Sequence, residues 1–135
     1  MGQQQLLLIV LGVIVVGIAV VVGINLFNAN AISANRDAVV SDLNNLGAMA
    51  QQFYKKPASM GGGANTFNTG GTSGSGFTIP TGLDSTANGT YTLGTVTASS
   101  VQIIGVGTET GNDKSTPVKA TATVTATAIT TAINN

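Results

Sequence analysis

Residues 6–24, LLLIVLGVIVVGIAVVVGI, decide the fold of this chain. These nineteen positions hold no polar side chain, and the first charged side chain of the protein is Arg36. As a helix the segment would be about 28 Å long, close to the roughly 30 Å hydrocarbon core of a bilayer. Exposing its Leu, Ile and Val side chains to water would cost on the order of tens of kcal/mol, more than the net stability of a domain. We therefore expect this segment to be buried in lipid or against copies of itself.

The segment differs from a cleaved signal peptide in two respects. No basic residue precedes it, and it is longer than the usual signal-peptide core of about 7 to 15 apolar residues. The triplet Ala29-Asn30-Ala31 has the small residues of a cleavage site. We nevertheless expect the apolar segment to stay on the protein.

Composition excludes several classes of function. The chain has 135 residues, a formal net charge of 0 and only 7% charged residues, which leaves room for one modest domain and no basic surface for nucleic acid. Cys and His are both absent, so disulfides, thiolate nucleophiles and imidazole catalysis are excluded. No nucleophile motif is present. We expect no enzymatic activity, no cofactor and no small-molecule ligand.

Metal binding has weak support. Asp84 and the Asn112-Asp113 pair are the plausible oxygen ligands for calcium. They lack the spaced ligand set of a calcium loop. We predict no metal site.

The helical pattern continues beyond the apolar segment. No proline occurs before Pro57, and Lys55 and Lys56 suit the carboxyl end of a helix. We predict one helix up to about Lys56, with an apolar part (residues 1–27) and an amphipathic part (28–56). Polar residues such as Asn35 and Asp42 lie on other faces of the helix and can face water. Six apolar residues recur at helical spacings and should pack against the rest of the domain: Ile32, Val39, Leu43, Leu46, Ala50 and Phe53.

The second half of the chain has the character of a sheet. Residues 57–75 are rich in Gly, Ser, Thr and Asn and predict a loop, followed by a sheet domain over residues 76–135. In its last part Val and Ala alternate with Thr and Lys, which predicts one face toward the helix and one toward water. We expect an α+β fold, a long amino-terminal helix packed against three or four antiparallel strands. The candidate strands are residues 76–80, 90–97, 100–106 and 118–129.

The order of these parts carries a resemblance. An apolar and then amphipathic helix is followed by a glycine-rich loop and an antiparallel sheet. Three groups of residues in the amphipathic part add to the pattern: Asn35-Arg36-Asp37-Ala38, Asp42-Leu43 and Gln51-Gln52-Phe53-Tyr54. Together they resemble type IV pilins and pseudopilins, through residues 1–56 by sequence and residues 76–135 by architecture alone.

The resemblance implies a structural subunit of an extracellular filament that polymerises with copies of itself through its hydrophobic amino-terminal helix. It also implies a stay in the inner membrane before assembly, and the pilus assembly machinery and prepilin peptidase as partners. Two alternatives remain open. One is a pseudopilin of a secretion system, and the other is a single-pass membrane-anchored surface or interaction domain.

The amino terminus departs from the family pattern. Family members usually carry a glutamate near the start of the mature chain, which is thought to pair with the terminal amine of a neighbouring subunit. If Met1 is the first mature residue, as we expect, Gln5 holds that position, and its amide cannot neutralise an ammonium group. Prepilin peptidase cuts after glycine, so processing at Gly2 is the alternative. The residues with an expected role in assembly are Met1, Gln3, Gln4, Gln5, Gly12, Gly17 and Gly23.

Each of these features also has a simpler interpretation. The three glutamines fit a polar cap on a membrane-spanning helix as well as an assembly contact. The glycines are spaced by five and six residues rather than the four of a GxxxG pair, so local packing room is the alternative. Asn88-Gly89-Thr90 matches an N-glycosylation sequon, although we favour a tight turn there.

Overall fold

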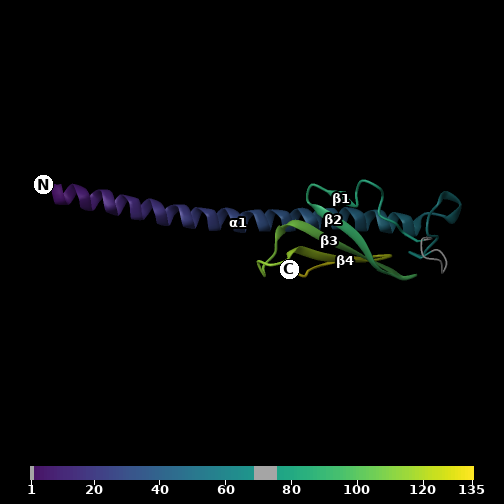
Figure 1. The fold of residues 1–135 in the computed structure, drawn as a ribbon. Coiled ribbons are helices and arrows are strands. Elements are labelled where there is room, and N and C mark those ends of the chain that lie inside the picture. The colour runs from purple at the N-terminus through teal and green to yellow at the C-terminus, as the bar shows by residue number, and fades with distance from the viewer. Residues whose placement is uncertain (1, 69–75) are drawn as a thin grey trace.

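One unbroken helix, α1 (Gly2–Lys55), forms the axis of the molecule and spans 54 residues. The computed structural model describes residues 2–68 and 76–135, so Met1 and part of the predicted 57–75 loop lie outside the described residues. The amino-terminal half of α1 extends alone, whereas a sheet lies along its carboxyl half (Figure 1). The predicted α+β arrangement of a long helix packed on an antiparallel sheet is confirmed.

The helix α1 ends at Lys55, two residues before a proline. Lys55 lies in its last turn, and Pro57 precedes a short 3-10 helix, η1 (Ala58–Met60). The loop that follows folds back and satisfies carbonyls of the last turn: Gly63 N donates to Phe53 O at 2.7 Å and Asn65 N donates to Tyr54 O at 2.8 Å. The end of α1 is therefore capped by its own loop rather than left open to solvent.

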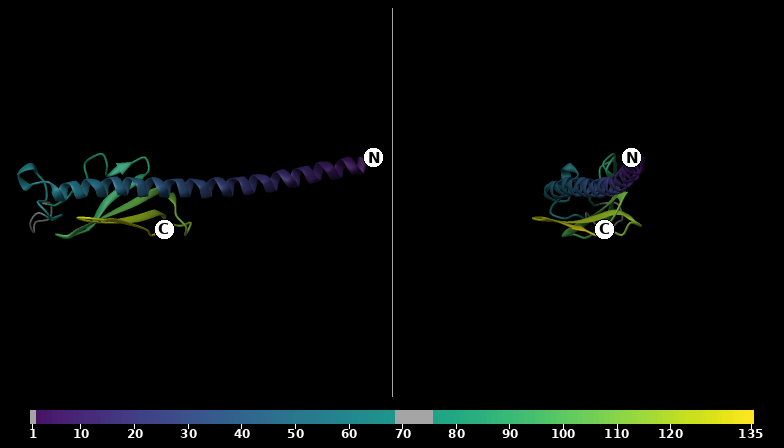
Figure 2. Two further views of the ribbon diagram at one scale, coloured as in Figure 1. Left: turned by 180° about the vertical axis from the view of Figure 1, so that it is seen from behind. Right: turned by 90° about the vertical axis from the view of Figure 1, so that its left-hand side faces the viewer.

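The sheet is a five-stranded antiparallel meander, in which each strand pairs with its neighbours in chain order. The strands are β1 (Ser85–Thr86), β2 (Gly89–Val96), β3 (Ser100–Thr110), β4 (Pro117–Thr125) and β5 (Ile129–Ile133). The sheet forms a single curved layer along α1, with β3 and β4 below the helix and β1 above it in the view of Figure 1, and Figure 2 shows the same layer from two other sides. The long strands bury alternate residues toward the helix and leave the others toward solvent.

The predicted strand number of three or four was wrong. The candidate strand 118–129 is in fact β4 and β5, separated by a tight turn in which Thr125 N donates to Ala128 O at 2.8 Å and Ala128 N donates to Thr125 Oγ1 at 3.1 Å. The alternation of Thr and Ala continues through this turn, and both residue types occur in strands as well as in turns. The pattern therefore gave no signal of the break.

The first candidate strand, residues 76–80, also differs from the prediction. It forms no strand and makes only an isolated bridge between Gly76 and Asn68. Pro80 has no N–H to donate to a ladder, and the side chains of Phe77 and Ile79 pack on the core instead. The edge position is taken by β1, whose two polar residues carry no hydrophobic alternation.

The core lies between one stripe of α1 and the inner face of the sheet. Its largest fully buried side chains include Leu43 of the helix, Ile103 of β3 and Phe67 of the loop. Two glycines bring the backbones close together. A Cβ on Gly105 would lie 2.9 Å from Val39 Cγ1, and one on Gly47 would lie 3.0 Å from Ile129 Cδ1.

Candidate assembly and membrane surface

The amino-terminal part of α1 presents an uncovered apolar surface, which we call the apolar rod (residues 6–27). Every large hydrophobic side chain between Leu6 and Phe27 is at least 53% exposed. Over residues 6–24 the rod is apolar around its whole circumference rather than along one stripe, which is typical of a helix buried on all sides in lipid or in a bundle. Its length and composition are sufficient to cross a membrane. The structure thus supports membrane anchoring through α1.

The first turn of α1 carries amides instead of charges. Gln3, Gln4 and Gln5 are all exposed, and the first turn contains no acidic residue. The first N–H groups of a helix have no partner within the helix, and the positive end of its dipole lies there. The three amide side chains can accept hydrogen bonds from such N–H groups, but they carry no charge that could neutralise the positive end of the dipole. Met1, the other predicted assembly residue at this end, lies outside the described residues.

The rod glycines have no packing reason within one subunit. A Cβ built on Gly12, Gly17 or Gly23 would meet nothing within 4 Å, in contrast to the crowded glycines of the sheet. A side chain at these positions would therefore cost nothing inside the isolated chain. Any need for glycine there must come from a second chain or from the helix itself.

The six predicted packing residues lie in three environments. Val39, Leu43, Leu46 and Ala50 are buried in the core between α1 and the sheet. Phe53 is half-buried at the edge of that core, with its ring 5.8 Å from the ring of Phe77. Ile32 lies outside the core, where α1 leaves the sheet, and lines a groove beside the β3–β4 turn.

Polar contacts that the helical pattern did not predict join α1 to the sheet. Asn35 Nδ2 donates to Asn88 O at 2.8 Å, and Asn35 Oδ1 accepts from Glu109 N at 3.3 Å. Gln51 Nε2 donates to Thr125 O at 3.1 Å. The prediction that Asn35 can face water is met only in part, because the residue is half-buried and hydrogen-bonded to the sheet. The only sequence signal for these contacts was that polar residues flank the apolar stripe of α1. Their partners lie far away in the sequence and could not be identified from it.

Asp42, also expected to face water, is the centre of a hydrogen-bonded cluster. Its Oδ2 accepts from Tyr91 Oη at 2.6 Å, from Asn88 Nδ2 at 3.0 Å and from Thr86 Oγ1 at 3.1 Å. Burial alone would raise the pKa of Asp42, but these three hydrogen bonds outweigh it and hold the pKa below its usual value. Burial and the contact with Asp42 together raise the pKa of Tyr91 well above its ordinary range. Asp42 is thus a charged anchor for the β1–β2 turn.

The sequon residue Asn88 is part of this cluster. It lies in the turn between β1 and β2, is half-buried, and points its carboxamide toward α1. Its backbone carbonyl accepts from Asn35 on the same helix. The carboxamide that would carry a glycan is already engaged with Asp42.

Asp113, one of the residues considered for calcium, has a structural role in a turn. Asp113 Oδ1 accepts from Thr116 N at 2.9 Å and from Ser115 N at 3.0 Å, and Asn135 Nδ2 donates to the same oxygen at 3.1 Å. Hydrogen bonds from the Thr116 hydroxyl and from these groups lower the pKa of Asp113 well below its usual value. Within residues 2–68 and 76–135, no group of three or more His, Cys, Asp or Glu side chains could hold a metal ion.

Neither the protein-family models, nor the curated proteins, nor the solved structures include a match to this chain. Its functional assignment therefore rests on the geometry of the apolar rod and of the head, by which we mean the sheet and the part of α1 that packs on it.

Proposed function

We propose that this protein is the structural subunit of a type IV pilus-like extracellular filament. In the filament the apolar rods of many copies bundle in the centre and the heads face outward. The subunit first resides in the inner membrane, with the rod in lipid, and exchanges lipid for neighbouring rods during assembly. Prepilin peptidase and the pilus assembly machinery are its partners in this process.

The observation that carries the proposal is the uncovered rod on an unbroken helix. Its large hydrophobic side chains are at least 53% exposed, and the rod continues into the sheet-bound half without a kink or a linker. A simple membrane anchor needs no rigid connection to its head, and a flexible linker would serve as well. A continuous helix fixes the head relative to the rod, which is the requirement for a repeating helical contact.

The rod glycines support the same proposal. A Cβ at Gly12, Gly17 or Gly23 would touch nothing within the subunit, so each position leaves room for the backbone of another helix to approach. Small residues permit such close approach between helices in an apolar environment.

Electron microscopy of sheared cell-surface material tests the proposal directly. We expect filaments that bind an antibody against the head and contain this polypeptide by mass spectrometry. Head-labelled filaments should be absent from a strain that lacks the gene, which serves as the control. A surface preparation that contains the protein but no filaments would refute the proposal.

A single-pass membrane-anchored interaction domain is the second candidate, because the rod is long enough to cross a bilayer by itself. In that case all of the protein would fractionate with membranes as a monomer. A detergent-free pool of high molecular mass would exclude this candidate.

A further inference from the structure

A groove lies where α1 leaves the sheet, between the rod-side end of the head and the β3–β4 turn. It has a volume of about 680 Å³, and its lining includes Asn25, Asn28 and Ile32 of α1 together with Glu109 and Lys114 of the β3–β4 segment. One wall is α1 and the other is a turn held in place by hydrogen bonds. The groove is therefore bounded by two elements of the folded head that hydrogen bonds hold together.

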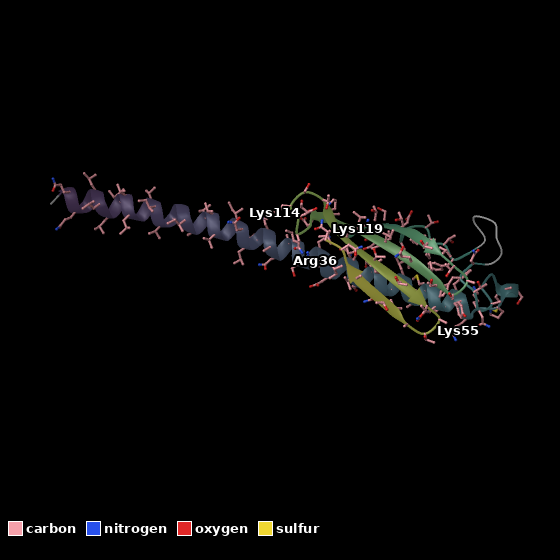
Figure 3. The ribbon with its side chains drawn as sticks, turned by 90° about the horizontal axis from the view of Figure 1, so that it is seen from below. Arg36, Lys55, Lys114 and Lys119 are labelled. Carbon is pink, nitrogen blue, oxygen red and sulfur yellow. The ribbon has the colours of Figure 1, made fainter. Side chains whose placement is uncertain are left out.

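Two contacts hold that turn against the helix. Arg36 Nη2 donates to Asn112 Oδ1 at 2.9 Å, and Glu109 N donates to Asn35 Oδ1 at 3.3 Å. Lys114 has a left-handed backbone with a φ of 56°. Figure 3 shows Lys114 on the side of the head nearest the rod, whereas Lys55 lies at the opposite end.

The position of the groove along α1 places it at the surface of a membrane. Asn25 directly follows the apolar residues 6–24, which match the thickness of the hydrocarbon core. The headgroup layer beyond that core is about 5 to 7 Å deep on each side, equivalent to roughly four residues of helix. Asn25 and Asn28 therefore lie within the headgroup layer when the rod spans the bilayer.

The groove offers one cation, one anion and two amides. The Lys114 ammonium matches a phosphate, and the Glu109 carboxylate matches a primary ammonium group, both through charge-assisted hydrogen bonds. The amides of Asn25 and Asn28 can donate to phosphate or ester oxygens. A choline headgroup has no N–H for Glu109 to accept, and quaternary ammonium groups favour aromatic cages, which the described lining does not contain.

We propose that this groove binds the zwitterionic phosphoethanolamine headgroup of a membrane lipid. Lys114 contacts the phosphate and Glu109 contacts the ammonium of a lipid in the leaflet next to the head. The bound headgroup fixes the depth and tilt of the subunit while its rod is in lipid. This site requires only that the rod spans a bilayer, so it exists whether or not the subunits later form a filament.

Lipid retention by the full-length protein tests this site. The protein is reconstituted into nanodiscs with equal amounts of phosphatidylethanolamine, phosphatidylcholine and phosphatidylglycerol, partially delipidated with mild detergent, and the retained lipids are measured by mass spectrometry. We expect phosphatidylethanolamine to be enriched several-fold over its share. Lys114→Ala and Glu109→Gln should each return its share toward the input value.

Two controls separate headgroup recognition from general effects. Lys55→Ala removes a cation at the far end of the head and should leave the enrichment unchanged. Glu109→Lys should shift the preference toward phosphatidylglycerol, because the groove then carries two cations. Circular dichroism of each variant checks that the head remains folded.

Three outcomes would overturn the assignment. They are equal retention of the three lipids by the native protein, a native preference for phosphatidylglycerol, and full enrichment that persists in folded Lys114→Ala. Electron microscopy of the same variants distinguishes this result from the proposed function, since loss of lipid selectivity with intact filaments would affect only the groove.

Discussion

The Asp42 carboxylate fastens the β1–β2 turn to α1 through a single oxygen. Tyr91, Asn88 and Thr86 all donate to Oδ2, at 2.6, 3.0 and 3.1 Å. Hydrogen bonds to a charged group contribute about 1.5 to 3 kcal/mol each to stability when net effects are counted. The cluster around the half-buried Asp42 therefore makes a substantial contribution to the stability of the head.

Asp42→Asn should destabilise the head. The neutral amide weakens all three hydrogen bonds and brings an NH₂ group near donors, so we expect a loss of about 1 to 3 kcal/mol. Thermal unfolding of the full chain in detergent, followed by circular dichroism, measures the change. Asp37→Asn, at an exposed position of the same helix, is the matched control, and an Asp42→Asn variant as stable as that control would contradict the prediction.

The same cluster predicts a dependence of stability on pH. The folded pKa of Asp42 lies below its ordinary value, so its contribution is fully present above the unfolded pKa of about 3.9 and is lost as pH falls through the folded pKa. The melting temperature of the native protein should therefore fall below about pH 4. Asp42→Asn should show a shallower decline.

Asp113 contributes in the same direction, because its pKa is also held low by hydrogen bonds. The double variant Asp42→Asn, Asp113→Asn should consequently show less pH dependence than either single variant. Identical melting profiles of the native protein and the double variant between pH 5 and about pH 2 would exclude this account.

At the residue scale, the sequence predicted the apolar contacts of α1 better than its polar ones. A helical period identifies which apolar residues share a face, and Val39 and Leu43 lie in the core. The same reasoning assigned Asn35 and Asp42 to solvent because it has no knowledge of partners elsewhere. Tyr91, the closest partner of Asp42, is 49 positions away in the sequence.

Among the elements, β3 approaches α1 most closely where glycine replaces a side chain. A Cβ on Gly105 would lie 2.9 Å from Val39 Cγ1 and 3.0 Å from Tyr91 Cε1. Those atoms belong to buried residues that have little room to move. Gly105 is therefore one of the positions at which the sheet approaches the helix too closely for a side chain.

Gly105→Ala should separate α1 from β3 or strain the side chains between them. Overpacking of this kind costs about 1 to 3 kcal/mol, which urea unfolding of the protein in detergent can measure. Gly94→Ala in β2 is a suitable comparison, because its Cβ would meet the movable end of the Gln102 side chain. Equal losses in both variants would show that close approach at Gly105 does not matter.

At the element scale, the long helix and the sheet were predictable but the boundaries of the last strands were not. The absence of proline before Pro57 and the apolar stripe were sufficient for α1. The turn between β4 and β5 contains only Ala and Thr, so no Gly, Pro or Asn marks it. The hydrogen bonds between Thr125 and Ala128 that define the turn become visible only in the folded backbone.

For the whole molecule, the proposed filament places the exposed rods of many copies in its centre. Val15→Asp should abolish filaments, since an unpaired carboxylate buried in a bundle of rods costs several kcal/mol. Filament yield by electron microscopy of sheared material is the measurement. Thr95→Asp, on the exposed side of β2, adds the same charge outside the rod and should preserve the yield. A native yield from Val15→Asp would refute the bundled rod.

Gln5→Glu should be tolerated if Gln5 faces the terminal amine of a neighbouring subunit. The added carboxylate would then meet an ammonium group and favour helix assembly at the positive end of the dipole. Filament yield at or above the native level is the expected result. Loss of filaments would place Gln5 in an apolar contact instead.

At the scale of the molecule, the rod was predictable from the sequence, because a single apolar segment buried in lipid satisfies its backbone hydrogen bonds as a helix. The groove at the base of the head was not, since it combines residues 25–32 of α1 with residues 109–114 of the β3–β4 segment. Segments so far apart in the chain are brought together only by the packing of the sheet on the helix.

The chain-order pairing of the sheet has a consequence for how the head forms. Each strand pairs with the strand that precedes it in the chain. The pairing partners are therefore always close in the sequence. Pairing of this kind closes short loops and proceeds quickly. A rod held in lipid is already helical, and its continuation offers the Val39–Ala50 stripe as a template for successive hairpins. The head can therefore fold in the order in which its segments are synthesised, and it is complete when β5 pairs with β4.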